Sequence, residues 1–290
     1  GIGHSGQRLF ERLVHAWSLA RSARSDSVAI GCRLRDGEGF RYRGIMASEA
    51  TTSAENDAAL AATPMIDADH PAVREFARSR AGEARDVKTR VLRLYYAVRD
   101  EIRYDPYSAA IEVEPLRAST SLQAGRAWCV PKAILLAAAC RALQIPARVG
   151  FADVRNHLST ARMREMMATD VFYWHGFTSI RVGDGGKRWV KATPAFNVEL
   201  CEKFGFLPLD FDGEQDSLYH PFDREGRKHM EYVNERGEYD DVPLDAMRAT
   251  FAEKYPFMTH DSGDSSGRFG GEADFDREVE LETRGPVDPG

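Results

Sequence analysis

Apolar residues recur at helical spacing through the middle of the chain. Between 86 and 102 they recur every three or four positions, with one adjacent pair, 94 and 95, and they are Val87, Val91, Leu94, Tyr95, Val98 and Ile102. Because a helix turns once in about 3.6 residues, this spacing gathers them on one face. Upstream, Asp69 and Pro71 form a typical helix start, and Gly82 is a typical stop. The pattern predicts two helices before residue 102.

A second pattern predicts a buried helix followed by strands. The run 129–143 is rich in Ala and Leu, and Pro146 ends it. Residues 147–154 alternate between apolar and polar, and 171–182 and 188–192 are strand-like runs joined by the glycine-rich turn 183–186. Helices first and antiparallel strands afterwards predict an α+β domain and not a doubly wound parallel sheet.

Composition divides the chain into three parts. Residues 1–62 show no sustained period and are expected to be an N-terminal extension, whereas 63–258 form the main domain, wrapped by its own C-terminal part from about residue 200. The segment 259–290 is acidic and glycine-rich with few large apolar side chains, which predicts disorder. Residues 261–290 hold nine acidic and three basic side chains, so they account for the whole net charge of -6.

The same numbers argue against several classes of protein. No basic run indicates a nucleic-acid partner. The longest apolar run, 133–140, falls short of the roughly 20 residues of a membrane span, and the N-terminal residues lack the apolar core of a secretory signal. The four cysteines show no zinc spacing, and Asp210–Asp216 lacks the order of a calcium loop. We therefore expect a cytoplasmic protein without metal or cofactor.

Cys129 is a candidate nucleophile because of its position in the sequence. It follows a turn at Gly125 and begins the Ala- and Leu-rich helix, whose positive end favours a thiolate. His175 lies on a later strand, and a polar residue, Thr193, ends the next one. A helix-borne Cys, a strand-borne His and a polar group on the following strand are typical of Cys–His hydrolases and acyl transferases.

Several segments, taken together, resemble the transglutaminase-like superfamily, the papain-fold cysteine enzymes and their bacterial relatives. The segments are 97–105, Trp128-Cys129, Gly150-Phe151, His175-Gly176 and 189–194. The resemblance covers roughly residues 64–200. It implies a papain-like α+β core in which N-terminal helices, including the nucleophile helix, pack on an antiparallel sheet. It also implies a Cys–His–Asp triad with Cys129 as nucleophile and His175 as base.

The third member of the triad departs from the family pattern. The family's Asp corresponds to Thr193, whose hydroxyl can accept the imidazole N–H but brings no negative charge. Asn197, Asp153 or Asp184 are alternatives if the fold brings one of them near. Gln123, six residues before the nucleophile, has the spacing of an oxyanion donor in papain-like enzymes. The expected walls of the substrate cleft are Trp128, Asn156, His157 and Trp174, with His157 also the second choice for the base.

These expectations lead to one favoured function and two alternatives. The favoured function is cysteine-dependent hydrolysis or transfer of an acyl group, through a thioester, on a protein, peptide or other amide substrate. Hydrolysis is the preferred outcome. A non-catalytic binding module that retains the fold with a degenerate triad is the main alternative, and Thr193 is the residue that favours it. A metal site would require His157 and His175 to converge with a carboxylate.

Overall fold

The computed structural model describes residues 57–156, 160–218, 224–226, 230–255 and 274–283. Contacts divide the chain into two units, 1–47 and 48–290. The first unit, and with it most of the predicted extension 1–62, lies outside the described residues. Within the part described, no helix is both long enough and apolar enough to cross a bilayer.

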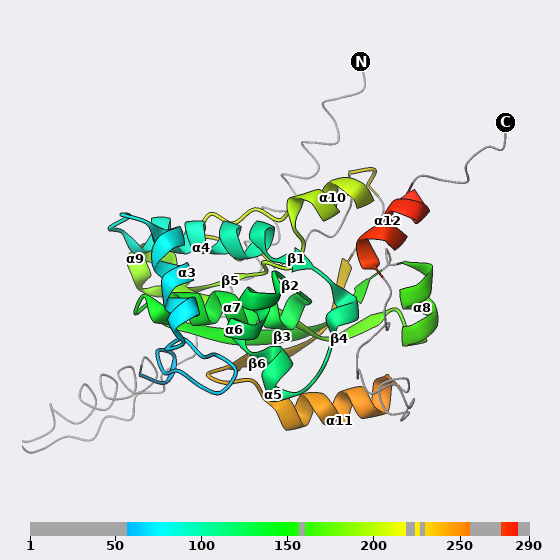
Figure 1. Cartoon of the computed structure of the whole chain (residues 1–290), viewed down its shortest axis with the longest axis horizontal. Coiled ribbons are helices and arrows are strands. Elements are labelled where there is room, and N and C mark those ends of the chain that lie inside the picture. Colours follow the sequence, from blue (N-terminus) through cyan, green and yellow to red (C-terminus); the bar gives the residue numbers. More distant parts are fainter. Residues whose placement is uncertain (1–56, 157–159, 219–223, 227–229, 256–273, 284–290) are drawn as a thin grey trace, which may run out of the picture. The chain divides into compact units, whose positions relative to one another are not determined.

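An antiparallel sheet of four strands forms the frame of the second unit, in the order β5-β4-β3-β6 (Figure 1). Its strands are β3 (Ala147–Asn156), β4 (Val171–Val182), β5 (Arg188–Ala192) and β6 (Met230–Tyr239). Two short strands, β1 (Arg103–Tyr104) and β2 (Arg126–Ala127), pair in parallel beside it. The antiparallel strands confirm the α+β class.

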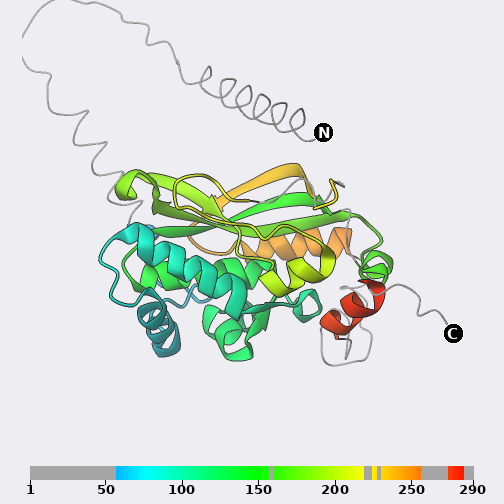
Figure 2. The ribbon, with the colours of Figure 1, turned by 90° about the horizontal axis from the view of Figure 1, so that it is seen from above.

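Helices cover one face of this sheet (Figure 2). The helices and the single 3-10 turn are α3 (Pro71–Ala81), α4 (Val87–Glu101), η1 (Pro106–Ser108), α5 (Val113–Leu116), α6 (Ala118–Ala124), α7 (Cys129–Ala142), α8 (Ala161–Met167), α9 (Gly183–Gly186), α10 (Val198–Phe204), α11 (Leu244–Lys254) and α12 (Phe275–Thr283). Helix α7 packs against β4, β3, α3, α4 and α6. Every residue from Cys129 to Arg141 is buried, as the Ala- and Leu-rich run predicts.

A buried lysine fixes helix α7 to the end of helix α4. The Lys132 side chain is fully buried, and its Nζ donates to the carbonyl of Arg99 (2.9 Å) and to that of Ile102. Lysine satisfies carbonyl groups at a helix C-terminus in this way. The contact aligns the start of α7, where Cys129 lies, with β1, which directly follows α4.

The structure differs from the predicted domain boundaries at both ends. Residues 57–62 belong to the folded unit, because the Ala59 carbonyl accepts from the Ala147 N–H (3.0 Å) and the Ala61 carbonyl accepts from Arg141 (2.6 Å). Residues 275–283, assigned to a disordered tail, form α12, which buries Phe275 and Val279. Two apolar residues four positions apart are enough to anchor a short helix on a neighbouring surface, although they hardly alter the average composition.

Candidate active site

Cys129 begins helix α7, and only 6% of it is exposed. Burial raises the pKa of its thiol to about 11. Hydrogen bonding from the backbone N–H groups of Gly176, Val130 and Cys129 itself acts in the opposite direction and lowers that pKa by less. At neutral pH the resting side chain is therefore the thiol, and a nucleophilic reaction requires a base that removes its proton.

Strand β4 passes directly against the start of helix α7 at Gly176. A Cβ atom at this position would lie 2.9 Å from the Cα of Val130 and 3.2 Å from the carbonyl oxygen of Cys129. Only glycine permits this approach without a shift of the helix backbone. The close approach brings His175, the residue before Gly176, to the level of the thiol.

A β-bulge in β4 precedes His175. Ala152 pairs with His175 and Val154 pairs with Phe172, so two residues of β4 lie opposite Asp153. One of the two, Trp174, has a positive φ of 60°. Bulges occur beside active sites because they change the direction of a neighbouring side chain.

Asp153 stabilises the bulge. Its carboxylate, in a residue only 4% exposed, accepts from the Trp174 N–H (3.1 Å) and from Arg236 Nε (2.6 Å). The Arg236 guanidinium also lies over the Trp174 ring, 4.5 Å from its centre. Asp153 therefore holds the backbone before His175, and its described contacts are not those of a residue that orients the imidazole.

The His175 side chain lines two cavities. The first, called here the nucleophile cavity, also contains Cys129 and has a volume of about 50 Å³. Its lining residues are Tyr104, Pro106, Ala109, Trp128, Cys129, Met163, Met167, Phe172, Tyr173, His175, Phe251 and Tyr255. Cys129 and His175 thus face a common space, as a nucleophile and its base must.

The second space, called here the threonine cavity, has a volume of about 30 Å³. It is lined by His175, Thr193, Ala195, Phe196, Cys201, Phe206, Leu207, Leu209, Leu218 and Met230. Thr193 is 4% exposed, and its hydroxyl has no hydrogen-bond partner among the described residues. A buried hydroxyl without a hydrogen-bond partner is costly.

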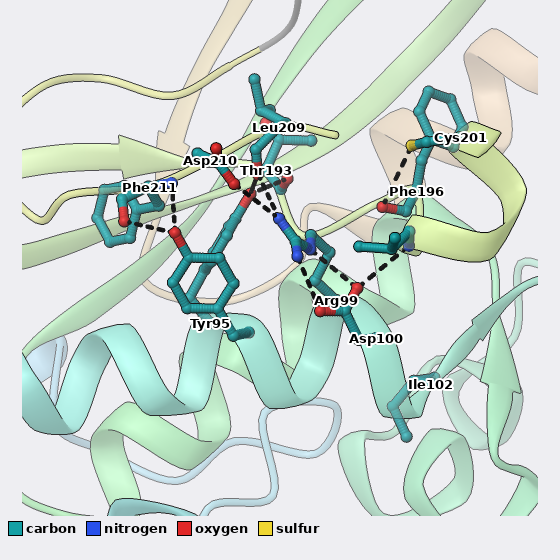
Figure 3. A network of polar contacts seen from close by, with 12 residues as sticks. Tyr95, Arg99, Asp100, Ile102, Thr193, Phe196, Cys201, Leu209, Asp210 and Phe211 are labelled. Atoms are coloured by element: carbon teal, nitrogen blue, oxygen red, sulfur yellow. Dashed lines mark hydrogen bonds and ion pairs between the residues drawn. The ribbon is translucent and has the colours of Figure 1, made fainter. Parts of the chain in front are cut away.

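Helix α4 fixes the backbone of Thr193. Tyr95 Oη donates to the Leu209 carbonyl (2.6 Å) and lies 3.2 Å from the Thr193 carbonyl oxygen. Arg99 forms ion pairs with Asp100 on α4 and with Asp210 on the segment after β5 (Figure 3). The second ion pair joins α4 to that segment. This network holds the end of β5 against α4 and sets the position of Thr193 relative to β4.

The other predicted orienting groups have different places. Asn197 Oδ1 accepts from the Tyr104 N–H (3.1 Å), so Asn197 holds β1 and lines neither cavity. Asp184 is exposed on α9 and lines neither cavity. Gln123 is exposed on α6 and is absent from the lining of the nucleophile cavity, so its role as an oxyanion donor stays a prediction from its spacing to Cys129. The helix α6 directs it to solvent.

The residues predicted as cleft walls lie in different places. Trp128 lines the nucleophile cavity. Trp174 does not, because the bulge directs its ring into the core, 5.3 Å from the ring of Phe151. Asn156 ends β3, and His157 lies outside the described residues. In the described part of the chain, no three His, Cys, Asp or Glu side chains come together as a metal site would require.

Sequence reasoning missed Tyr104 as a site residue. Tyr104 lies on β1, beside β2 and therefore next to Trp128-Cys129, and its phenol lines the nucleophile cavity. Burial raises the pKa of Tyr104 well above its ordinary value, and the nearby Cys129 raises it further. The ring is held by Phe196 (4.8 Å between ring centres) and Phe275 (5.9 Å). Tyr104 lies in the segment 97–105, which contributed to the family resemblance but gave no indication of a chemical role for this residue.

Comparison with known proteins agrees with the resemblance drawn from the sequence. Residues 74–194 match the family model of the transglutaminase-like superfamily, so this segment is similar to the core of that superfamily. This match supports a cysteine enzyme as the general type of protein. A solved structure from Cytophaga hutchinsonii, described as a candidate cysteine protease, shares 19% identity with a TM-score of 0.36. The similarity covers 47% of this chain and 40% of that one, and no curated protein matches.

Proposed function

We propose that the protein is a cysteine-dependent acyl hydrolase, with α7 as the nucleophile helix on the antiparallel sheet. The observation that carries the proposal is the common cavity of Cys129 and His175. Burial keeps the thiol protonated, and the imidazole facing the same cavity is the base that it needs. The substrate is an amide or ester of a peptide, a protein or a smaller molecule.

The reaction proceeds in two halves. His175 accepts the thiol proton while the sulfur of Cys129 bonds to the carbonyl carbon, and the carbonyl oxygen becomes an oxyanion. The oxyanion then collapses, and the leaving amine or alcohol departs with the proton from the imidazolium, which leaves a thioester. Water, deprotonated by His175, attacks the thioester and releases the acid and the thiol. With an amine in place of water, the product is a new amide.

Two further residues support these steps in our proposal. Tyr104 lines the nucleophile cavity, and its hydroxyl donates to the oxyanion, a part for which the sequence suggested Gln123. Thr193 accepts the second imidazole N–H, directly or through one water, for which a cavity of about 30 Å³ has room. The hydroxyl orients the ring without supplying the negative charge of an Asp.

The test is turnover of an activated ester and a peptide amide by Cys129→Ala and His175→Ala. Cys140→Ala is the matched control, because Cys140 is buried on the same helix and lines neither cavity. We expect both site variants to lose turnover while the control keeps it. Adding methylamine reports transfer, through the methylamide product. Wild-type turnover no faster than the uncatalysed background would favour the non-catalytic binding module, whose motivating residue is Thr193. Measurable turnover that is equal in Cys129→Ala and wild type would remove Cys129 as the nucleophile.

A further inference from the structure

The walls of the nucleophile cavity are almost entirely apolar. Four of them come as two pairs spaced by four residues. Met163 and Met167 lie on α8, and Phe251 lies on α11 with Tyr255 directly after the end of that helix. None of the described lining residues carries a carboxylate, an ammonium or a guanidinium group. A charged group that entered this cavity would lose its hydration without gaining a counter-charge.

Most of the polar side-chain atoms that line this cavity are either hydrogen-bonded or take part in the proposed mechanism. Tyr255 Oη donates to the Val171 carbonyl (3.1 Å) and accepts from the Tyr173 N–H (2.8 Å). Cys129, His175 and Tyr104 act on the reacting carbonyl in the proposed mechanism. Few groups remain to bind a polar substituent, so the remaining wall contacts favour hydrocarbon.

The size of the cavity limits the hydrocarbon it can hold. A dry cavity of about 150 Å³ admits benzene, whereas this one measures about 50 Å³. A short aliphatic chain fits this volume. The thioether side chains of Met163 and Met167 adapt to different aliphatic shapes more readily than a branched wall would.

We propose that the nucleophile cavity receives a short, uncharged aliphatic group of the acyl donor, next to the carbonyl that Cys129 attacks. The enzyme then selects donors with such a group over donors of equal length that end in a carboxylate. The assignment of the aliphatic group to the acyl donor rests on the proposed function. The preference of the cavity itself can be measured without turnover.

The first experiment compares two alkylating reagents of similar length on the wild-type protein. N-propyl iodoacetamide is neutral, and N-(2-carboxyethyl) iodoacetamide carries a carboxylate at the same position. Mass spectrometry of the peptide with Cys129 gives both rates, and each is divided by the rate with glutathione. We expect a preference of about tenfold or more for the propyl reagent. A ratio near one would overturn the proposal.

A cavity-filling variant supplies the second experiment. Ala109→Leu places a larger side chain in the lining, and Ala72→Leu, on the exposed face of α3, is the matched control. We expect Ala109→Leu to slow alkylation by the propyl reagent about tenfold, while plain iodoacetamide reacts within about threefold of wild type. The control keeps both rates. An unchanged propyl rate in a folded Ala109→Leu protein contradicts the proposal.

Ester turnover separates this inference from the proposed function. The wild type is expected to hydrolyse the p-nitrophenyl ester of butyrate at least about tenfold faster than that of succinate. Selective alkylation without any turnover that depends on Cys129 would refute the enzyme and leave the aliphatic cavity standing. Equal turnover of both esters would keep the enzyme and refute the aliphatic preference.

Discussion

At Cys129, burial and hydrogen bonding act on the thiol in opposite directions. The position at a helix start predicted a stabilised thiolate, but burial raises the thiol pKa to about 11 in spite of three backbone N–H groups. Little thiolate is then present at pH 6, so rapid alkylation at that pH is not expected of the resting protein. Activation depends on the base, which makes His175 as important as the nucleophile.

Tyr104 gives the sharpest prediction at the residue scale. If its hydroxyl donates to the oxyanion, Tyr104→Phe lowers kcat by about 10²- to 10³-fold with little change in KM. Alkylation of Cys129 by iodoacetamide forms no oxyanion, so its rate stays near that of wild type. Tyr96→Phe is the control, because the Tyr96 hydroxyl binds the Phe211 carbonyl and lines neither cavity. A Tyr104→Phe enzyme with wild-type kcat would remove Tyr104 from the mechanism.

Thr193 supplies the second prediction. Asp153 and Asn197 are bound elsewhere, whereas Thr193 lines the threonine cavity together with His175. Thr193→Val should lower kcat/KM about tenfold or more, whereas Thr193→Asp should keep or raise it by adding negative charge near the imidazolium. Steady-state kinetics at several pH values measure both effects. An unchanged kcat/KM in Thr193→Val would show that another group orients the imidazole ring.

The elements that place these residues were predictable to different degrees. The patterns that predicted α4, α7, β3, β4 and β5 are confirmed: α4 buries one apolar face, whereas α7 is buried on all sides. Strand β6 was missed, since its middle residues 233–235 are exposed and carry no apolar alternation. The bulge in β4 was also missed, because it depends on the pairing of two strands and not on local composition.

The bulge gives a prediction at the scale of the element. Asp153→Ala removes the partner of Arg236 and the acceptor of the Trp174 N–H. It should therefore destabilise the protein by about 3 kcal/mol. It should also lower kcat/KM, because His175 is displaced. Asp153→Asn keeps an acceptor for the N–H and should retain more activity. Urea unfolding and kinetics measure the two effects. Glu231→Gln, which breaks an ion pair between β6 and β3, is the control. An equal loss of stability and of kcat/KM in this control would show that Asp153 is no more important to the site than another ion-pair residue of the sheet.

The candidate site as a whole was only partly predictable. The order of Cys129, His175 and Thr193 along the chain indicated the chemistry, and the structure brings each of them to the wall of a cavity. Tyr104, Met163 and Phe251 join the site from elements far apart in the sequence, and no spacing rule connects them. The same limit applies to Gln123, which is exposed on α6, because its sequence distance to Cys129 does not fix the direction of its side chain.

Lys132 makes the stability of the whole molecule depend on pH. Burial lowers its pKa to about 7, against an ordinary value of 10.5, while Asp100 raises it and Arg99 lowers it to smaller extents. Between these two values the unfolded chain holds a proton that the folded chain has released. The free energy of unfolding therefore rises with pH in that window, and below about pH 7 the folded protein bears the full cost of the buried charge.

Urea unfolding at pH 6.5, 8 and 9.5 tests this dependence. Subtracting the result for Lys132→Met isolates the contribution of this lysine from those of other groups that titrate in the range. The difference should grow steadily with pH. Lys187→Met, at an exposed position, is the control and should show no such trend. A difference that stays flat with pH would mean that Lys132 keeps its ordinary pKa.

The central claim is that Cys129 forms a thioester with the acyl group of the substrate. Rapid acid quench after mixing with p-nitrophenyl butyrate, followed by mass spectrometry, measures this adduct directly. The account predicts an added butyryl group on the peptide that contains Cys129 in the wild type, slow formation in His175→Ala and none in Cys129→Ala. Turnover that proceeds with no adduct on Cys129, or with the adduct on another residue, would contradict it.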